Sequence, residues 1–278
     1  MAFQGTAGAN SDLACREVHP ELATLPCPSF EDAFDAVRQG RARLAMIPVE
    51  NSVNGRVADI HHLLPQGGLH IVGEHFQRVE HHLLVNPGVR LEELRFARSH
   101  VQALGQCRES LRGLGLTPVA ASNTAVAAQE LAASGARDTA AIASALAGRI
   151  YGLEVLRPNI EDHHGNTTRF LVMQREAQVP ALGAGPVLTS FVFRVRSVPA
   201  ALYKALGGFA TNGVNIVKLE SYLVDGHFTQ AQFYAEVEGH PEERPLRLAL
   251  EELNFFANPV TILGVYPVSP FRAQAGRG

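Results

Sequence analysis

The stretch SFEDAFDAVRQGRARLAMIPVENS, residues 29–52, contains one complete helix-to-strand unit. Ser29 and Asp32 have the spacing of a capping box, with aspartate in place of glutamate, and the apolar residues that follow share one helical face. Gly40 predicts the end of this helix. Residues 44–49 are almost continuously apolar, which is typical of a short buried strand. The stretch therefore predicts a helix that leads into a strand of an α/β sheet.

The same alternation extends outward through the first two-thirds of the chain. Ser99 with Gln102 predicts a second capping box, and Ser122 or Asn123 predicts the start of a third helix. The predicted strands in this part are residues 69–76, 81–85, 117–121, 140–143, 153–156 and 168–173. Repeated β-α-β units of this kind favour an α/β domain with parallel strands.

The last third of the chain has a different pattern. Residues 174–187, QREAQVPALGAGPV, lose all periodicity and are predicted to be a linker. The predicted strands beyond it are residues 189–195, 214–224, 227–237 and 260–265, with helices that begin near Pro199 and near Leu246 and a hairpin turn at Asp225-Gly226. The order βαββαβ is the ferredoxin-like pattern. We expect residues 269–278 to be disordered.

Composition excludes several classes of protein. The chain of 278 residues has 24 basic and 27 acidic side chains, so no strongly basic surface predicts a nucleic-acid partner. The longest charge-free stretch, residues 253–271, is interrupted by prolines and asparagines, so we expect no membrane span. With three widely spaced cysteines and no signal segment, the chain is expected to be cytoplasmic. Lys204 and Lys218 are the only lysines, which excludes Schiff-base chemistry from the first 203 residues.

Polar clusters stand at five predicted strand or helix ends. Any one of them is typical of a helix cap or a loop, but carboxyl ends of parallel strands meet at one edge of a sheet. Together the clusters are rich in neutral donors and include one arginine, so they predict a site for a small carboxylate. The clusters are residues 5–8, 50–52, Ser99 with Gln102 and Gln106, residues 122–124, and residues 166–169.

Other candidate sites are less favoured. The histidine pairs 61–62, 81–82 and 163–164 are poor metal sites, because adjacent residues on a strand point to opposite faces. Cys107 lies among apolar helix positions and is predicted to be a small buried hydrophobic residue. Residues 5–8 lack the G-x-G-x-x-G spacing of a dinucleotide site, so NAD is not expected. No metal and no cofactor is therefore predicted.

Five motifs resemble the prephenate dehydratase family. They are FQGTAGANS at 3–11, IPVENS at 47–52, SHVQALGQC at 99–107, IED at 160–162 and NTTRF at 166–170. The resemblance covers essentially the whole chain and includes no chorismate mutase or dehydrogenase segment. It implies a two-lobed catalytic domain over residues 1–178, similar to periplasmic binding proteins, and a regulatory ACT domain over residues 188–268.

The resemblance also implies a reaction and a set of site residues. Prephenate would lose water and carbon dioxide to give phenylpyruvate, a reaction that needs no metal or cofactor because aromatisation drives it. Thr168 is expected to donate to the departing hydroxyl, Arg169 to grip a carboxylate and Phe170 to shape an apolar wall. Asn51, Ser99 and Gln106 are expected to orient the two carboxylates. Glu50 is either a general acid or a brace for the Asn51 loop.

The family's ACT domain binds phenylalanine at a subunit interface, so the resemblance implies feedback inhibition in a homodimer or homotetramer. The ligand loop here reads VPAAL at 198–202, with Ala200 where the family pattern has glycine, and the strand segment reads ESYL at 220–223. The effector residues implied are Ala201, Leu202, Asn215, Ile216, Glu220 and Ser221. Three alternatives stay open: an arogenate dehydratase, a non-catalytic amino-acid-binding protein, and an ACT domain that serves only assembly.

Overall fold

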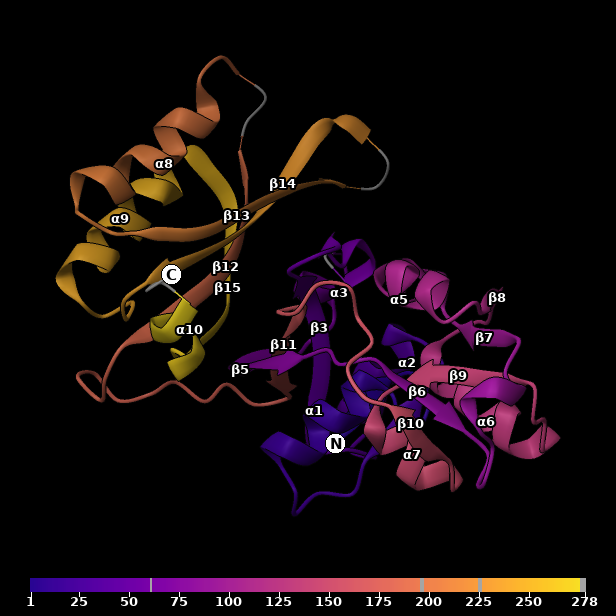
Figure 1. The fold of residues 1–278 in the computed structure, drawn as a ribbon. Helices are drawn as coiled ribbons and strands as arrows, with labels where there is room; N and C mark the ends of the chain where they lie inside the picture. The colour runs from indigo at the N-terminus through magenta and orange to yellow at the C-terminus, as the bar shows by residue number, and fades with distance from the viewer. Residues whose placement is uncertain (61, 196–197, 225–226, 276–278) are drawn as a thin grey trace. The chain divides into compact units, whose positions relative to one another are not determined.

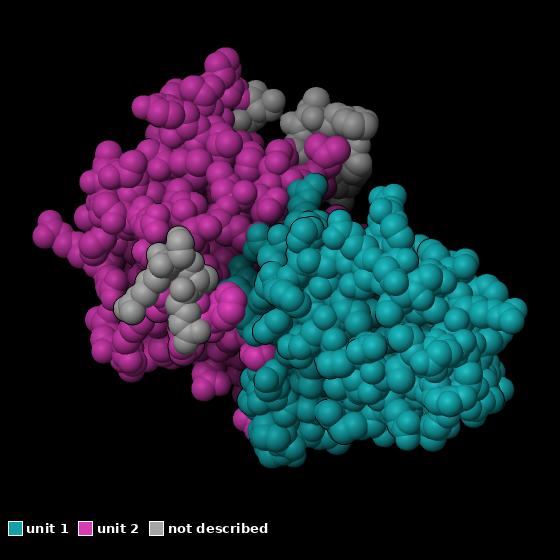
Figure 2. All heavy atoms as spheres, viewed as in Figure 1, with its two compact units in different colours: residues 1–33, 50–56, 76–169 teal, residues 34–49, 57–75, 170–278 magenta. Residues whose placement is uncertain are grey.

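The computed structural model describes residues 1–60, 62–195, 198–224 and 227–275 (Figure 1). The chain divides into two compact units, one of residues 1–33, 50–56 and 76–169 and the other of residues 34–49, 57–75 and 170–278 (Figure 2). The expected domain limits, 1–178 and 188–268, stay a prediction.

The first 174 residues alternate short strands and helices. The strands are β1 (Ala2–Gln4), β2 (Leu25–Cys27), β3 (Ala45–Asn51), β4 (Gly55–Arg56), β5 (His70–Arg78), β6 (His82–Val85), β7 (Phe96–Ser99), β8 (Thr117–Ala120), β9 (Thr139–Ala143), β10 (Glu154–Arg157) and β11 (Thr167–Gln174). The helices are α1 (Asn10–Val18), α2 (Phe30–Arg38), α3 (Leu63–Gln66), α4 (Val101–Gln106), α5 (Arg108–Gly113), α6 (Thr124–Ser134) and α7 (Ala145–Tyr151), with 3₁₀ turns η1 (Ala58–Ile60) and η2 (Leu91–Glu93).

The helix-to-strand unit predicted from residues 29–52 is confirmed. The Ser29 hydroxyl accepts from the Asp32 backbone N–H at 3.1 Å and donates to its carboxylate at 2.8 Å, which begins α2. Gly40 follows the helix with a φ of +75°, a conformation that favours glycine. The strand β3 then places Asn51 at its last position.

The five-stranded sheet of the first unit has the order β10-β6-β9-β7-β8. Strand β7 is parallel to β8 and β9, whereas β6 is antiparallel to both β9 and β10. The prediction of parallel strands is therefore wrong for this sheet, which is mixed. Apolar periodicity identifies a buried strand but carries no information on its direction.

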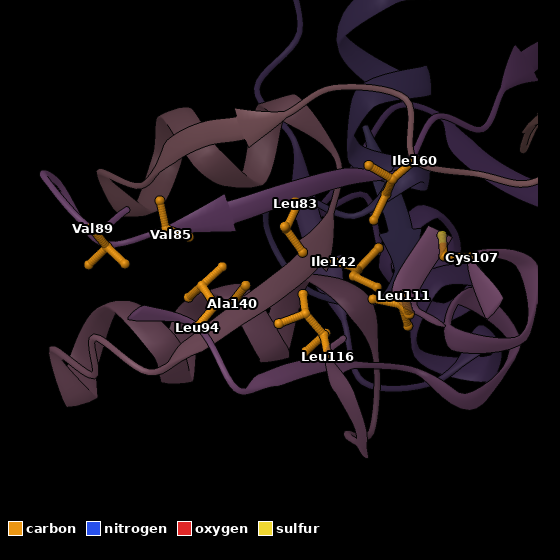
Figure 3. Packing of buried hydrophobic residues seen from close by; sticks show 11 residues of the cluster. Leu83, Val85, Val89, Leu94, Cys107, Leu111, Leu116, Ala140, Ile142 and Ile160 are labelled. Atoms are coloured by element: carbon orange, nitrogen blue, oxygen red, sulfur yellow. The ribbon is translucent and has the colours of Figure 1, made fainter. Parts of the chain in front are cut away.

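The edge strands β8 and β10 of this sheet are largely exposed, whereas β6 and β9 are buried on both faces. Side chains alternate along a strand, so neighbouring residues of β6 and β9 enter different apolar clusters. Leu83 and Ile142 point into one apolar cluster, which Figure 3 shows together with Leu111 and Leu116. Leu84, the neighbour of Leu83, belongs instead to the cluster formed with α6 and α7. Burial on both faces explains why these strands read as continuous apolar runs.

The helix predicted from Ser99 differs in its start and its continuity. His100 caps α4, since its ring accepts from the Gln102 backbone N–H at 3.3 Å. Ser99 is the last residue of β7, and its hydroxyl donates to the Ile142 carbonyl at 2.6 Å. The predicted capping box at Ser99 is therefore wrong, and the helix is divided at Cys107 into α4 and α5.

The C-terminal region confirms the βαββαβ order. Its elements are β12 (Val187–Val195), α8 (Ala201–Thr211), β13 (Ile216–Val224), β14 (His227–Glu238), α9 (Arg244–Phe256) and β15 (Ala257–Pro267). The strands lie in the order β13-β14-β12-β15 and are antiparallel to their neighbours. The core between sheet and helices includes Phe191, which stacks on Phe209 of α8 with ring centroids 5.8 Å apart. The turn predicted at Asp225-Gly226 lies outside the described residues.

The prediction for the linker is confirmed, whereas the prediction for the C-terminal end is not. No helix or strand occurs between Gln174 and Val187, as predicted for residues 174–187. By contrast, residues 270–275 form the helix α10 (Pro270–Ala275), so the prediction of disorder is wrong there. Arg272 of this helix donates to both carboxylate oxygens of Glu74 at 2.8 and 2.9 Å. This ion pair, in which the carboxylate is buried and the arginine is partly exposed, fixes the position of the short helix despite its weak sequence signal.

Candidate active site

Asn51, at the end of β3, is held in one orientation by its own turn. Its Oδ1 accepts from the backbone N–H groups of Val53 and Asn54 at 3.0 and 2.9 Å. A backbone N–H can only donate a hydrogen bond, so the side-chain atom of Asn51 that faces these two groups must be the oxygen. The other terminal atom of the side chain is therefore the amide nitrogen. That nitrogen donates to Asn166 Oδ1 at 2.7 Å and to Thr168 Oγ1 at 3.0 Å. Asn51 therefore binds Thr168, which lies in β11, and Asn166, which lies directly before that strand.

The Thr168 hydroxyl receives a donor from inside the protein. Its oxygen accepts from Asn51, so its proton must point along another direction. Within the described part of the chain this proton has no hydrogen-bond acceptor, and the side chain is partly exposed. Thr168 is thus an oriented hydroxyl that can donate to an outside oxygen.

Backbone hydrogen bonds hold the segments of Asn51 and Thr168 together. The Ser52 N–H donates to the Thr167 carbonyl at 2.9 Å, and the Thr167 N–H donates to Ser52 Oγ at the same distance. The Val79 N–H donates to the Asn166 carbonyl at 2.8 Å. These bonds explain the motifs ENS and NTT as one joined structure.

Gln106, the last residue of α4, extends the same network. Its Oε1 accepts from Asn166 Nδ2 at 3.0 Å and lies 2.7 Å from His81 Nε2. The structure therefore brings together three of the predicted residues, Asn51, Gln106 and Thr168. The sequence analysis missed the part of His81, because it treated this residue only as half of a histidine pair.

Arg169 and Phe170 lie deeper than the sequence analysis expected. Arg169 is 4% exposed, and its guanidinium carbon lies 5.9 Å from the centre of the Phe76 ring. Phe170 is 1% exposed and is part of the core. Since neighbouring side chains of a strand point to opposite faces, Thr168 and Arg169 diverge from β11. Their roles toward a substrate stay predictions.

Ser99 and Glu50 have structural contacts of their own. Ser99 is fully buried and its hydroxyl is bonded to Ile142, which braces β7 against β9. Within the described residues no hydrogen bond joins it to Asn51 or Gln106, so its role at the site stays a prediction. Glu50 lies opposite Arg56 in the β3–β4 hairpin, and its choice between acid and brace stays open.

Two further predicted clusters also meet. Asn123 caps α6 by accepting from the Val126 N–H at 2.7 Å, and its Nδ2 lies 3.5 Å from Thr6 Oγ1. Gly8 has a φ of +86°, and a Cβ there would lie 2.8 Å from the Ala147 Cα, so only glycine fits. The loop of residues 5–8 is therefore fixed against α6 and α7.

Cys107 and His82 are both buried, and burial shifts the pKa of each in the direction that favours its neutral form. Burial raises the pKa of Cys107 to about 12, so its thiol stays protonated at neutral pH, as expected for a buried hydrophobic residue. Burial likewise lowers the pKa of His82. Among the described residues, no three His, Cys, Asp or Glu side chains are grouped to hold a metal, and none of the helices is long and apolar enough to span a bilayer.

The predicted effector residues lie at the start of α8, on β13 and, for Asn215, in the segment directly before β13. Ala200 has a φ of +61°, the left-handed conformation that glycine would adopt without strain. The Ala201 N–H donates to the Val198 carbonyl at 3.2 Å, so one of the two amides expected to meet an effector is already bonded. Asn215 accepts from the Glu238 N–H through its carbonyl. In β13 the Lys218 ammonium lies 3.4 Å from Glu220. The effector roles of Leu202, Ile216 and Ser221 also stay predictions.

Known proteins resemble this chain over nearly its whole length. The family model of prephenate dehydratase matches residues 1–178. A protein of Komagataeibacter europaeus named as a bifunctional N-acyl-homoserine lactone acylase/prephenate dehydratase is 53% identical over 275 residues, covering 99% of this chain and 98% of that protein. The chloroplastic arogenate dehydratase/prephenate dehydratase 1 of Arabidopsis thaliana is 40% identical, covering 98% of this chain and 73% of that protein.

Solved structures agree with these relatives. A prephenate dehydratase from Arthrobacter aurescens in complex with L-Phe is 29% identical, with a TM-score of 0.87 over 99% of this chain and 96% of that one. A structure described as GqqA, a novel type of quorum quenching acylase, is 53% identical, with a TM-score of 0.92 over 98% of each chain. The motifs joined by Asn51 and these matches lead to one conclusion: the chain belongs to the prephenate dehydratase family, whose members are lyases that act on prephenate.

Proposed function

We propose that this chain converts prephenate into phenylpyruvate, water and carbon dioxide. The single observation that carries the proposal is the partly exposed Thr168 hydroxyl, whose oxygen accepts from Asn51 and whose proton is therefore available to another acceptor. In the reaction the ring C–O bond breaks while that oxygen, hydrogen-bonded by Thr168, takes up one proton from solvent and leaves as water. The bond between ring and carboxylate breaks at the same stage, and its electron pair completes the aromatic ring while carbon dioxide departs.

The role of Thr168 is to stabilise the leaving oxygen. A threonine hydroxyl is a weak acid, so it acts by hydrogen-bonding the charge that develops on that oxygen. Asn51 has both amide hydrogens and its carbonyl oxygen committed to protein groups. It therefore acts through Thr168 and is a positioning residue, not a direct ligand of a carboxylate as the sequence analysis expected.

Charge and neutral donors near the network suit a dianionic substrate. Gln106 has its oxygen occupied by two donors, which leaves its NH₂ group to meet a substrate carboxylate. Arg169 is the cation of the NTTRF motif. It is buried and leaves β11 on the face opposite Thr168, so it contributes to binding of the second carboxylate through its charge and not through a direct contact. Glu50, Ser99 and Phe170 are supporting residues in this proposal.

Arogenate is the alternative substrate of the same elimination. It carries an amino group where prephenate has a keto group, and the plant relatives are named for both substrates or for arogenate alone. The test is incubation of the purified protein with each compound separately, with phenylpyruvate and phenylalanine measured. Formation of neither product would refute the proposal, and the ratio of kcat/KM values assigns the preferred substrate.

A second candidate activity is cleavage of the amide bond of N-acyl-homoserine lactones. It is favoured by the 53% identity to a relative with this activity in its name, because the match covers 98% of that protein and leaves no room there for a separate acylase domain. The reaction consumes one water and yields a fatty acid and homoserine lactone. Release of homoserine lactone by the wild-type protein, measured against boiled protein, would support it, and none would exclude it.

We further propose that phenylalanine inhibits the enzyme through the ACT domain of residues 188–268, and that the chain acts in the cytoplasm as a homodimer or homotetramer. The L-Phe complex of the Arthrobacter relative supports the effector. Calorimetric titration with phenylalanine during an activity series tests it, and light scattering after gel filtration gives the assembly. Heat without inhibition would leave the domain a binding or assembly module.

A further inference from the structure

The amide of Gln106 has two possible orientations, and only one of them presents N–H groups to a substrate. Its carbonyl oxygen lies 3.0 Å from Asn166 Nδ2 and 2.7 Å from His81 Nε2. Among the described residues the amide nitrogen of Gln106 has no hydrogen-bond partner, and the side chain is partly exposed. Whatever holds the oxygen inward therefore decides what the outward nitrogen can bind.

The direction of every hydrogen bond in the network follows from a fixed starting point. The backbone N–H groups of Val53 and Asn54 can only donate, so Asn51 Oδ1 accepts and Asn51 Nδ2 donates to Asn166. Asn166 Oδ1 is then the acceptor, and Asn166 Nδ2 must donate to Gln106 Oε1. The Gln106 Oε1 lies 2.7 Å from His81 Nε2 and can only accept a hydrogen bond. The imidazole Nε2 must therefore carry a hydrogen and donate it.

The backbone of His81 is fixed by the IED motif. The His81 N–H donates to Glu161 Oε2 at 3.0 Å, and the Ile160 N–H donates to the His81 carbonyl at 2.8 Å. The N–H of Asp162, the last residue of the motif, donates to the backbone carbonyl of Gln106 at 2.8 Å. One segment of three residues thus sets the distance between His81 and Gln106, and His81 is 3% exposed. The imidazole is held in a fixed position, and Gln106 is its one hydrogen-bond partner among the described residues.

We infer that His81 is a positioning residue that donates from Nε2 to the Gln106 oxygen and so turns the Gln106 NH₂ group toward a substrate carboxylate. The inference rests on the proposed function and names a residue that acts on binding, whereas Thr168 acts on the leaving group. Loss of the donor removes one of two bonds that hold the amide. A neutral hydrogen bond contributes roughly 1 to 1.5 kcal/mol, which corresponds to a change of about tenfold.

The first test is steady-state kinetics with prephenate. His81→Leu removes the donor at similar volume and should raise KM about tenfold with kcat little changed. His81→Gln places an N–H near the position of Nε2 and should restore KM. The matched control is His82→Gln: His82 is the buried neighbour, and its Nδ1 accepts from the Asn159 N–H at 3.2 Å and not from the network of Gln106. This variant should keep the wild-type KM even if its Tm falls.

Two further measurements make the outcome decisive. In a Gln106→Met background, His81→Leu should change KM no further, because its route is through Gln106. Independent of activity, nitrogen-15 NMR of the imidazole should report a hydrogen on Nε2. An Nδ1–H tautomer, or a wild-type KM in His81→Leu, would overturn the inference. If His81→Leu does not fold, His81→Asn, whose N–H falls short of Gln106, replaces it. Absence of turnover in the wild type would refute the proposed function and leave the NMR test standing.

Discussion

The substitution Asn51→Asp changes a single group at the centre of the site. The nitrogen that donates to Asn166 at 2.7 Å and to Thr168 at 3.0 Å becomes an oxygen, while the Oδ1 that accepts from Val53 and Asn54 is kept. The new oxygen meets the Asn166 oxygen without a hydrogen between them. It also accepts the proton of the Thr168 hydroxyl, which turns this donor away from the substrate.

The magnitudes follow from one lost and one reversed hydrogen bond. The bond to Asn166 is lost and the bond to Thr168 is kept with its direction reversed, so the free energy of unfolding should fall by roughly 1 kcal/mol. Loss of one oriented donor to a developing negative charge typically lowers kcat by about 10²-fold, or about 2.7 kcal/mol. The assay is phenylpyruvate formation from prephenate, with urea unfolding of the same samples. Asn54→Asp is the matched control, because it adds the same charge to the same turn, where only the Asn54 backbone is bonded.

The reasoning also predicts how Asn51→Asp combines with Thr168→Ala. If Asn51 acts through the Thr168 hydroxyl, the double variant should have about the same kcat as Thr168→Ala alone. Two outcomes would refute this. One is a wild-type kcat in Asn51→Asp, and the other is a double variant whose kcat is about 10²-fold below that of Thr168→Ala.

Three other predictions concern stability. Burial opposes the charge of Asp162, but its carboxylate accepts from the Glu109 and Ser110 N–H groups at the start of α5, and these bonds hold its pKa below the usual 3.8. The wild type should therefore have a higher Tm than Asp162→Asn above about pH 4, and this difference should vanish as the pH falls further. A Tm difference that grew in acid would contradict this. Ala200→Gly, at a φ of +61°, should raise stability by up to about 1 kcal/mol in urea unfolding, and a loss would refute the strain. Arg272→Met removes the cation shared by the buried carboxylates of Glu74 and Glu236, so it should lower the free energy of unfolding by about 3 kcal/mol. The control Arg247→Met, which breaks an exposed ion pair, should lower it by less than about 1 kcal/mol. Equal losses would refute the role of α10.

Local signals in the sequence were sufficient where one contact decides the structure. Ser29 and Asp32 are three residues apart, and their capping box was predicted and is present. The order βαββαβ of the C-terminal region is likewise present as predicted. The capping box depends on neighbours in the chain, and the order of elements depends on local patterns, both of which a sequence displays directly.

The remainder depended on contacts between distant residues. The direction of β6 relative to β9, the bond of Ser99 to Ile142, and the ion pair of Arg272 with Glu74 all join segments far apart in the chain. His81 belongs to the site for the same reason, through Gln106, 25 residues away. The five-residue set of Asn51, His81, Gln106, Asn166 and Thr168 could be predicted in part from its motifs, whereas the direction of each hydrogen bond required the geometry.

The most direct test of the account is the kcat of Thr168→Ala and Thr168→Ser with prephenate, measured beside the wild type. The hydroxyl is held by Asn51 and is expected to stabilise only the departing oxygen. The account predicts that the alanine variant loses kcat by about 10²-fold with KM changed by less than about twofold, and that serine recovers part of the loss. An alanine variant with the kcat of the wild type would contradict it.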